Sequence, residues 1–566
     1  MTAQANDCGQ PATGIHEVQG TVARSPLAGE TVTVEGILTR DSRHQGGFDG
    51  FYLQQADGET DSNPDTSEAL FVYTSHKAGR PGQRLRVTGT IKEYHDLTEM
   101  VALKTIQICG KGEMPTPIDV ALPWSQPPES LENMRVRFTA PLTIIDHYQL
   151  ATYGELTLAA NDQITGTERF PPGEQAVAHS QNNKHHRVVL DDGRKVRNPE
   201  PVPWPTGGFG PDNTLRAGDQ VEQLAGILDY RFGQWRLQAV NGPQFTRRTP
   251  RPSAPAPPGE GVIRVMALNL QNYFNGDGKS GGFPTDRGAK TLAGFRAQQQ
   301  RIASLVKKSQ PDILAVSELE NDGYGPYSAI ADLAASLGPA WRFVKTPGQD
   351  GGDAIRTALL YRNDRVAPRQ EPERLTTGLF AHSSRPPVSQ RFSAPGQGQT
   401  LRVVSAHLKS KSCRNASGAN QDRHDGQGCF NQRRVQEVRA ILQWLKALPD
   451  SDHLAGTLVT GDLNSYAREA PVRHFEKAGY RSLVHRIHPC NETRCRHHTY
   501  RFRGEKGSLD YLLASENLQK LALTAGSWNV NADEARALTD YPGPGRAGPW
   551  RASDHNPVFT DLQLVD

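Results

Sequence analysis

A proline-rich segment divides this chain into two parts with different sequence patterns. Residues 249–259 read Thr-Pro-Arg-Pro-Ser-Ala-Pro-Ala-Pro-Pro-Gly. Proline fixes φ and lacks an N–H donor, so this composition predicts an extended, semi-rigid linker and excludes a helix or a central strand. A chain of 566 residues is also too long for one hydrophobic core. The linker is therefore the clearest domain boundary in the sequence.

The part before the linker repeats one short β-strand pattern. Residues 29–37 read Gly-Glu-Thr-Val-Thr-Val-Glu-Gly-Ile, residues 82–91 repeat the pattern closely, and residues 218–227 repeat it loosely. Alternating apolar residues predict a strand with one buried face, and an interior glycine predicts a bulge or sharp bend. These copies resemble the strands of oligonucleotide/oligosaccharide-binding (OB) barrels. We expect a tail at 1–19 and two OB-like β modules at 20–112 and 116–248.

Two features of these modules leave alternatives open. Barrels of this kind often bind single strands on aromatic platforms, but aromatic residues also fill the interior of small barrels. Either reading suits the group of aromatic and basic residues in the first module, Arg43, His44, Phe48, Phe51 and Tyr52. The second module contains a long polar segment at 161–213, which we expect to be mostly loop.

After the linker, apolar strands alternate with helices. Helices are expected at 293–308, 328–337 and 432–447, and strands at 262–268, 312–316, 358–361, 401–406, 458–460 and 508–513. Alternation of this kind predicts a layered α/β domain. We assign it to residues 260–566.

In this second part, the strands deliver polar side chains at or near their ends. Segment 461–464 is the clearest case, because side chains alternate along a strand and Asp462 and Asn464 point the same way. Any one of these residues could be a turn or capping group, but their recurrence favours one shared site. Its members are Asn269, Glu318, His407, Asp462, Asn464, Asp510, Asp554 and His555.

These residue types suit phosphodiester hydrolysis. Carboxylate and carboxamide oxygens are good ligands for Mg²⁺, Mn²⁺ or Ca²⁺, and such a cation neutralises charge on a phosphoryl group. Histidines transfer protons near neutral pH when a carboxylate orients the imidazole. The chain has neither a Gly-x-Ser-x-Gly elbow nor a His-Glu-x-x-His motif, which disfavours a serine hydrolase and a zinc protease.

Composition limits the remaining choices. The 64 basic and 61 acidic residues give a net charge of +3, which neither demands nor excludes a polyanionic partner. No apolar run approaches the roughly 20 residues of a membrane span, and we expect a monomer.

Six cysteines favour disulfides and an oxidising compartment, although fifteen pairings are formally open. No signal peptide is visible at the N-terminus, so we expect a mature secreted form with an added methionine in preference to a cytosolic protein with free thiols.

The ordered motifs of the second part resemble those of the endonuclease/exonuclease/phosphatase superfamily, which includes pancreatic deoxyribonuclease and the apurinic endonucleases. In chain order they are Leu268-Asn269, Ser317-Glu318, Ala406-His407-Leu408, Gly461-Asp462-Leu463-Asn464, Leu509-Asp510-Tyr511 and Ser553-Asp554-His555. The resemblance covers about 260–566. It implies a four-layered α/β sandwich, in which two β-sheets pack between helices.

The resemblance also implies a divalent metal, Mg²⁺ or Mn²⁺, with Ca²⁺ as a further candidate. Glu318 would be its principal ligand, assisted by Asn269 and Asp554.

The same resemblance implies a catalytic role for five residues. Asp462 would orient or activate the attacking water, and Asn464 would hold a phosphate oxygen. Asp510 would orient His555. His407 would contact the phosphate from the other side and assist proton transfer.

A narrower resemblance is to extracellular bacterial nucleases of the ExeM/NucH type, which also carry barrel modules before the nuclease domain. It rests on Asn272-Tyr273-Phe274, residues 318–325, Asp353-Ala354-Ile355, Arg385-Pro386-Pro387 and residues 407–411. We expect four of these residues to contact substrate: Asn272, Arg385, Lys409 and Lys411.

Three disulfides are expected. The spacing of Cys413 and Cys429 resembles a disulfide-bearing loop of the same nucleases. Cys8 and Cys109 would tie the tail to the last strand of the first barrel. Cys490 and Cys495 are close together in a charged loop.

The leading hypothesis is a secreted, metal-dependent nuclease that attacks DNA internally with little sequence specificity, with RNA as a further candidate substrate. A phosphatase or phospholipase-type phosphodiesterase of the same superfamily is the alternative. A binding protein with an inactive catalytic domain is the third reading, which the complete motifs disfavour. Basic residues beside His407 favour the nuclease because they suit a phosphate track, although a solvated loop would look the same: Lys409, Lys411, Arg414, Arg423, His424, Arg433 and Arg434.

Overall fold

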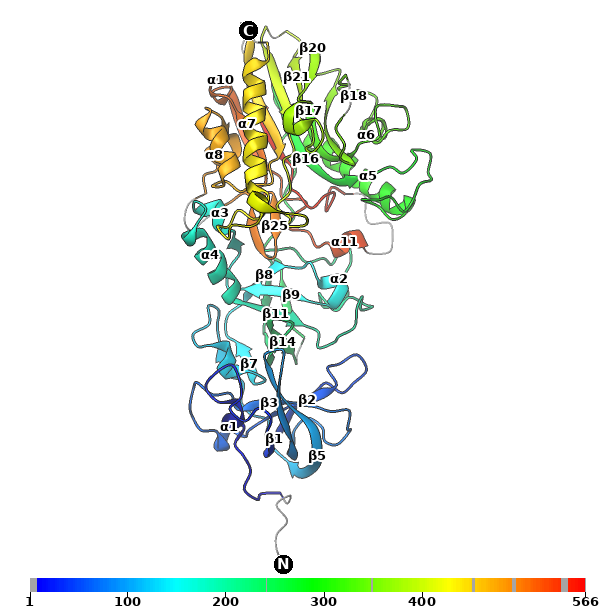
Figure 1. The fold of residues 1–566 in the computed structure, drawn as a ribbon. Coiled ribbons are helices and arrows are strands. Elements are labelled where there is room, and N and C mark those ends of the chain that lie inside the picture. The colour runs from blue at the N-terminus through cyan, green and yellow to red at the C-terminus, as the bar shows by residue number, and fades with distance from the viewer. Residues whose placement is uncertain are drawn as a thin grey trace, which may run out of the picture. The chain divides into compact units, whose positions relative to one another are not determined.

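The computed structural model describes residues 8–240, 242–347, 350–396, 398–449, 453–490, 495–540 and 548–564 (Figure 1). The chain forms two compact units. Unit 1 comprises Met1–Asp162, Asn183–Thr249 and Ala535–Asp540, and unit 2 comprises Gln163–Asn182, Pro250–Glu534 and Tyr541–Asp566. The linker is therefore not the only point at which the chain passes between the units. Each unit contains one segment from the other side of the linker.

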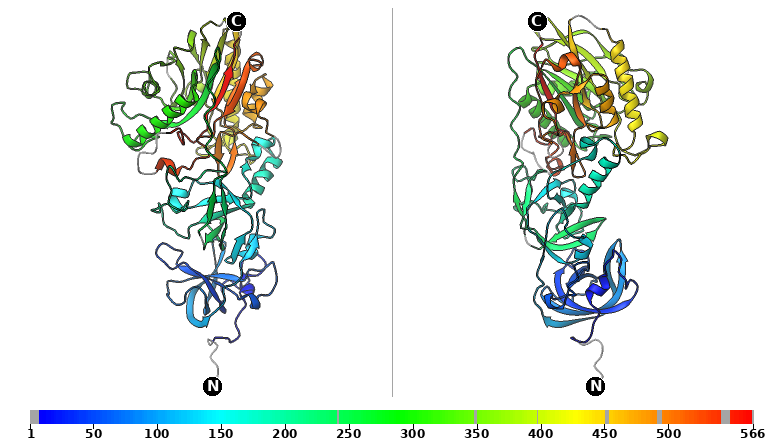
Figure 2. Two further views of the ribbon diagram at one scale, coloured as in Figure 1. Left: turned by 180° about the vertical axis from the view of Figure 1, so that it is seen from behind. Right: turned by 90° about the vertical axis from the view of Figure 1, so that its left-hand side faces the viewer.

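The first β-sheet of unit 1 is a closed five-stranded barrel with the strand order β1-β2-β3-β5-β4 (Figure 2). Its strands are β1 (Thr31–Asp41), β2 (Gly50–Gln54), β3 (Ala69–Tyr73), β4 (Gln83–Tyr94) and β5 (Leu97–Lys111). The first two copies of the repeated pattern form β1 and β4, which pair antiparallel. Gly36 is required in β1 because a Cβ there would lie 2.8 Å from the carbonyl oxygen of Gln54. Helix α1 (Ile15–Gln19) adds Ile15 and Val18 to the barrel core.

The aromatic residues of this barrel are buried in two different places. Phe51 and Tyr52 are fully buried, and Phe48 is 7% exposed. Arg43 is also enclosed, where it pairs with Asp41 and donates to three backbone carbonyls. Phe51 belongs to the barrel core, so it alone fills the barrel as one reading expected, whereas Phe48 and Tyr52 pack in a separate cluster with Ile227. These three rings form no exposed stacking platform.

The second β-sheet of unit 1 is open and nine-stranded, so the prediction of a second small barrel is wrong. Its order is β15-β12-β8-β9-β11-β14-β13-β7-β6. The strands are β6 (Ile118–Val120), β7 (Arg135–Phe138), β8 (Leu142–Asp146), β9 (Leu156–Ala159), β11 (Arg187–Asp191), β12 (Gln220–Glu222), β13 (Ala225–Arg231), β14 (Gln234–Ala239) and β15 (Gln244–Thr246). The expected loop at 161–213 supplies β11, which pairs with both β9 and β14. Val188, Val189 and Leu190 are buried there and extend the sheet.

Two short helices complete the core of this sheet. They are α2 (Leu150–Tyr153) and α11 (Ala537–Asp540). Leu150, Ala535 and Ala537 pack in the same buried cluster as the strands.

Unit 2 is built on two six-stranded sheets, with the orders β18-β19-β17-β16-β29-β28 and β20-β21-β22-β23-β27-β24. The first contains β16 (Ile263–Tyr273), β17 (Ile313–Glu320), β18 (Trp341–Phe343), β19 (Ile355–Arg362), β28 (Ala522–Ser527) and β29 (Val558–Leu562). The second contains β20 (Ala367–Arg374), β21 (Val388–Ser393), β22 (Thr400–Ser405), β23 (Leu454–Asp462), β24 (Arg481–Ser482) and β27 (Asp510–Ala514). Apolar side chains of both sheets, such as Val265, Leu359, Val403 and Leu512, meet in one buried cluster.

Helices cover the outer faces of the two sheets. The α5 helix (Leu292–Ser309) and the α6 helix (Ala329–Leu337) pack against β16, β17 and β19 of the first sheet. The α7 helix (Asn431–Ala447) and the α8 helix (Ala470–Lys477) pack against β22, β23 and β27 of the second. Two shorter helices are α9 (Leu483–Ile487) and α10 (Glu516–Gln519). This order of helices, sheet, sheet and helices is the predicted four-layered sandwich.

Strand pairing brings the polar strand ends together. Strands β16 and β17 are parallel, with Asn269 opposite Ser317. Strands β22 and β23 are parallel, with Ser405 opposite Thr460. Parallel strands end at the same edge of a sheet, so the polar residues that follow collect there.

A small third sheet of unit 2 includes a strand from before the linker. Its order is β10-β26-β25, with β10 (Gln163–Ile164), β25 (Tyr500–Phe502) and β26 (Glu505–Gly507). The short helix α3 (Gly166–Arg169) follows β10, and α4 (Glu174–His185) comes next. Residues 163–182 thus complete the unit that otherwise lies after the linker.

The three expected disulfides are present: Cys8–Cys109, Cys413–Cys429 and Cys490–Cys495. Among the described helices, none combines the length and the apolar character needed to span a membrane.

Candidate active site

The predicted residues meet around Asp462, at the end of β23. Asn269 Nδ2 donates to Asp462 Oδ2 at 3.2 Å, and His407 Nε2 lies 3.4 Å from the same oxygen. Ligand atoms of Asp462, Asp510 and His555 all lie within 4.8 Å of one another. These five side chains are between 1% and 6% exposed. The site is thus a compact, largely desolvated cluster, in which charges interact more strongly than in water.

Asp510 and His555 form a carboxylate–imidazole pair. His555 Nδ1 lies 2.7 Å from Asp510 Oδ2, and the Tyr500 ring lies over the imidazole at 4.5 Å between centroids. Burial alone would lower the pKa of His555, but Asp510, and then Asp462 and Asp554, outweigh it, so the pKa lies well above its usual value. His555 is therefore protonated at neutral pH and can donate from Nε2.

Asn464 is held in an unusual conformation beside Asp462. Its φ is +47°, in the left-handed region that asparagine tolerates better than most residues. The backbone N–H of Asn464 donates to Asp462 Oδ1 at 2.8 Å, and its Nδ2 donates to the carbonyl of Leu408 at 3.1 Å. The turn therefore fixes the Asp462 carboxylate and joins it to the segment after β22 that contains His407.

The pKa of Asp462 is shifted upward and the pKa of His407 is shifted downward. Burial raises the pKa of Asp462 to about 7, with His555 opposing the shift and Asp510 adding to it. Burial lowers the pKa of His407 well below its usual value, and Arg385 lowers it further. Arg385 Nη1 lies 2.9 Å from Nδ1 and 2.8 Å from Nε2 of this imidazole. Asp462 can thus exchange a proton near neutral pH, whereas His407 stays neutral.

Glu318, Asn269 and Asp554 remain the predicted ligands of a divalent cation. Glu318 has a φ of +58° and accepts the backbone N–H of Asn272 at 3.0 Å. Desolvation raises the pKa of Glu318, and the neighbouring negative charge of Asp554 raises it further. A hydrogen bond from Asn269 and the charge of His555 oppose this shift only in part. Two crowded carboxylates beside a carboxamide suit the hard oxygen coordination of Mg²⁺ or Mn²⁺.

Comparison with known families agrees with this geometry. The model of the Endonuclease/Exonuclease/phosphatase family matches residues 266–555, which is more than half of the chain. The chain belongs to the endonuclease/exonuclease/phosphatase family. A second model, described as a domain of unknown function, matches residues 128–249. No curated protein matches the chain.

Solved structures resemble the chain over about half of its length. The human Nocturnin catalytic domain with bound sulfate is 18% identical, covers 54% of this chain and 95% of its own, and has a TM-score of 0.35. An endonuclease/exonuclease/phosphatase from Bacteroides vulgatus is 16% identical, with coverages of 54% and 99% and a TM-score of 0.36. TDP2 of D. rerio, complexed with a single-strand DNA product, is 17% identical, with coverages of 53% and 98% and a TM-score of 0.33.

In this member of the endonuclease/exonuclease/phosphatase family, three of the four expected substrate contacts lie near the clustered residues. Arg385 is 7% exposed, contacts His407 and donates from Nη2 to the carbonyl of Leu408 at 2.7 Å. Asn272 donates its backbone N–H to Glu318, and its side chain is partly exposed. Lys409 follows the same strand as His407, and its Nζ lies 4.8 Å from the centre of the Phe430 ring.

The expected substrate contact at Lys411 stays a prediction, although its ammonium group is already paired. Lys411 Nζ pairs with Glu469, whose side chain is fully buried, and burial lowers the pKa of this lysine to about 8. Arg434 is also fully buried and donates to the carbonyls of Gln427 and Cys429. Arg434 thus ties the Cys413–Cys429 loop to α7, and Lys411 pairs with the residue that precedes α8.

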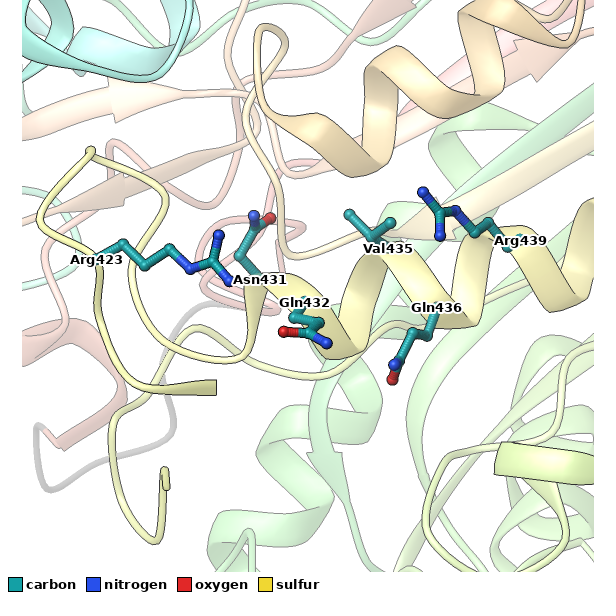
Figure 3. A pocket seen from close by; sticks show the side chains of 6 residues that line it. All are labelled: Arg423, Asn431, Gln432, Val435, Gln436 and Arg439. Carbon is teal, nitrogen blue, oxygen red and sulfur yellow. The ribbon is translucent and has the colours of Figure 1, made fainter. Parts of the chain in front are cut away.

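A pocket on α7 lies apart from the catalytic cluster (Figure 3). Five of its residues project from the helix, and the sixth comes from the preceding loop. They are Arg423, Asn431, Gln432, Val435, Gln436 and Arg439. None of the predicted site residues lines it.

Sequence reasoning missed two side chains next to the site. Tyr500 stacks on His555 from the third sheet. Arg287 pairs with Asp353 at 3.2 Å, and Asp353 lies 4.0 Å from Arg385. Neither sits at the end of a strand of the main sheets, so strand-end position could not have identified them.

Proposed function

We propose that the protein is a secreted, divalent-metal-dependent nuclease that cleaves phosphodiester bonds within DNA with little sequence specificity. The observation that carries this proposal is the position of Asp462 beside two imidazoles, those of His407 and His555, whose pKa values are shifted in opposite directions. A water near Asp462 Oδ2 would give its proton to this carboxylate, whose pKa of about 7 suits a general base. As the water oxygen bonds to phosphorus, the P–O bond to the leaving sugar oxygen would break. His555 would give its Nε2 proton to that leaving oxygen, and Asp510 would hold its ring in place.

The remaining residues would bind and orient the phosphate. The amide of Asn464 and the neutral ring of His407 would contact non-bridging oxygens, and Arg385 would neutralise part of their charge. A divalent cation held by Asn269, Glu318 and Asp554 would supply further neutralisation of the phosphate when bound.

A chain of cations beside His407 supports a polyanionic substrate over a small phosphate ester. Beyond the effect of burial, Arg385 and Arg287 are both close enough to lower the pKa of Lys409, and the acidic side chains near it are Asp353 and Glu437. Side chains of this kind are what sequence-independent contact with a nucleic acid backbone requires. RNA remains a second substrate for testing. A monomer is part of the same proposal.

The secreted location is supported by the cysteines. All six are paired in disulfides. Disulfides persist in oxidising compartments and are rare in the cytosol.

Supercoiled plasmid tests the function directly. With Mg²⁺ or Mn²⁺ the protein should convert closed circular DNA to the relaxed form, and EDTA should abolish the conversion. A closed circle has no ends, so relaxation requires internal attack. If plasmid and RNA stay intact while inositol phosphates or sphingomyelin are hydrolysed, the phosphatase or phospholipase-type alternative is correct.

Substitution of Lys409 and of Lys411 distinguishes a lysine that contacts substrate from one that stabilises the fold. Lys409→Met should weaken DNA binding and reduce the slope of log K against log salt concentration by about one. Lys411→Met should leave that slope unchanged but lower the free energy of unfolding by on the order of 3 kcal/mol, because Glu469 would stay buried without its partner. Binding by fluorescence anisotropy across salt concentrations, with urea unfolding, measures both. Equal slopes for the wild type and Lys409→Met would exclude Lys409 from the phosphate track.

A further inference from the structure

The segment before the linker supplies a buried carboxylate to unit 2. Glu168, on α3, has no exposed side-chain surface. Its Oε2 accepts the backbone N–H groups of Ala467 and Ser508, each at 3.2 Å. Its Oε1 lies 2.9 Å from Nε2 of His485. One carboxylate therefore joins three separate parts of the catalytic unit.

The two backbone groups that Glu168 holds are close in sequence to catalytic residues. Ala467 follows the turn that contains Asp462 and Asn464. Ser508 precedes Asp510, the partner of His555. The carboxylate thus links the segment that carries the water-activating residue with the segment that orients the imidazole.

Neighbouring contacts hold Glu168 in this place. Strand β10 pairs parallel with β26, which leads directly into Ser508. The carbonyl of Thr167 accepts the N–H of Arg468 at 2.9 Å, and the Thr167 hydroxyl donates to Glu469 at 2.8 Å. Burial would raise the pKa of Glu168, but the hydrogen bond and charge of His485 lower it overall, so the carboxylate is ionised. A charged acceptor makes stronger hydrogen bonds than a neutral one.

We propose that Glu168 is a positioning residue that sets the placement of Asp462 relative to the Asp510–His555 pair, so that the active site requires a segment from before the linker. This inference rests on the proposed phosphodiester hydrolysis only for its kinetic test. A fragment that begins at residue 260 would lack Glu168. Among the described contacts, this carboxylate is the only acceptor that Ala467, Ser508 and His485 share.

Substitution in the full chain tests the proposal. Glu168→Leu fills the space but offers no acceptor, so kcat should fall about 10–100-fold with KM nearly unchanged, because a small misplacement of reacting groups is costly. Glu168→Gln keeps one oxygen for the two N–H groups and should recover kcat to within about threefold of the wild type. If Glu168→Leu does not fold, Glu168→Asp replaces it, since the shorter side chain cannot reach all three partners. That variant should lose about 3–10-fold in kcat.

A matched control distinguishes positioning from general loss of stability. Asp561 is a buried carboxylate of the same unit, paired through both oxygens with Arg264. Asp561 lies near the far end of β29, and His555 precedes the first residue of this strand. Asp561→Asn removes a comparable ion pair and should leave kcat unchanged at temperatures where the variant is folded.

Hydrogen–deuterium exchange provides a readout that does not depend on activity. In Glu168→Leu, or Glu168→Asp where that variant replaces it, peptides covering 462–469 and 505–512 should exchange faster, while the rest of unit 2 stays protected. If exchange changes as expected but the wild type cleaves no phosphodiester, Glu168 positions the two segments and the proposed function is wrong. Wild-type kcat and unchanged local exchange in a folded Glu168→Leu or Glu168→Asp would overturn the proposal.

Discussion

Replacement of His555 with alanine is expected to lower kcat by about 10²–10⁴-fold, the usual contribution of one positioned acid–base group. The charged imidazole of His555 is available to the phosphate because Asp510 holds Nδ1 at 2.7 Å. The proposed oxygen ligands Asn269, Glu318 and Asp554 stay in place in this variant. The Mg²⁺ or Mn²⁺ concentration that gives half-maximal rate should therefore change little. Initial rates on DNA over a range of metal concentrations measure both quantities.

Asp510→Asn provides the second half of this test. An amide cannot stabilise the imidazolium, so the loss should resemble that of His555→Ala. Because the two side chains act as one unit, the double variant should lose much less than the product of the separate losses. Fully multiplicative losses, or a near-wild-type rate for His555→Ala, would show that the pair is wrongly assigned.

Glu318→Gln is the second prediction with a large expected effect. The amide keeps the size of the side chain but removes the negative charge that a divalent cation would bind. We expect the metal concentration for half-maximal rate to rise by at least about 10–100-fold, since even changes to groups behind a metal ligand have effects of that size. The rate at saturating metal should also fall.

Glu320 is a matched control on the same strand. It lies two residues further along β17, accepts the backbone N–H of Asn275 at 3.0 Å, and has a pKa raised to about 7 by burial. Glu320→Gln should leave metal demand close to that of the wild type. If both variants shift metal demand equally, the effect is a general change of charge and Glu318 is not the principal ligand.

Much of the catalytic cluster could be predicted from sequence because its members share a local property. Asn269, Glu318, His407 and Asp462 each lie within or directly after an apolar strand, and alternation along a strand fixes which way a side chain points. The parallel pairs β16–β17 and β22–β23 then bring those strand ends to common edges. The two-sheet sandwich follows from the same alternation of strands and helices.

Other features depend on contacts between distant segments and could not be predicted in this way. Lys411 and Arg434 look like free cations in the sequence, but in the structure they contact a buried carboxylate and two buried carbonyls from other segments. The open nine-stranded sheet depends on β11, whose three apolar residues are too few to stand out in a polar stretch. Glu168 is distant in sequence from every residue that it contacts in the catalytic unit.

The exchange of segments between the two units has a consequence for the order of folding. Ala535 and Ala537 belong to the core of the nine-stranded sheet, yet all strands of that sheet come before the linker. A ribosome makes the chain from its N-terminus at about 5–20 residues per second. The five-stranded barrel can close as soon as β5 has emerged, whereas the neighbouring sheet lacks part of its core until residues 535–537 have been made. These residues, synthesised about 290 positions after the last strand of the sheet, therefore determine when the first unit reaches its full stability.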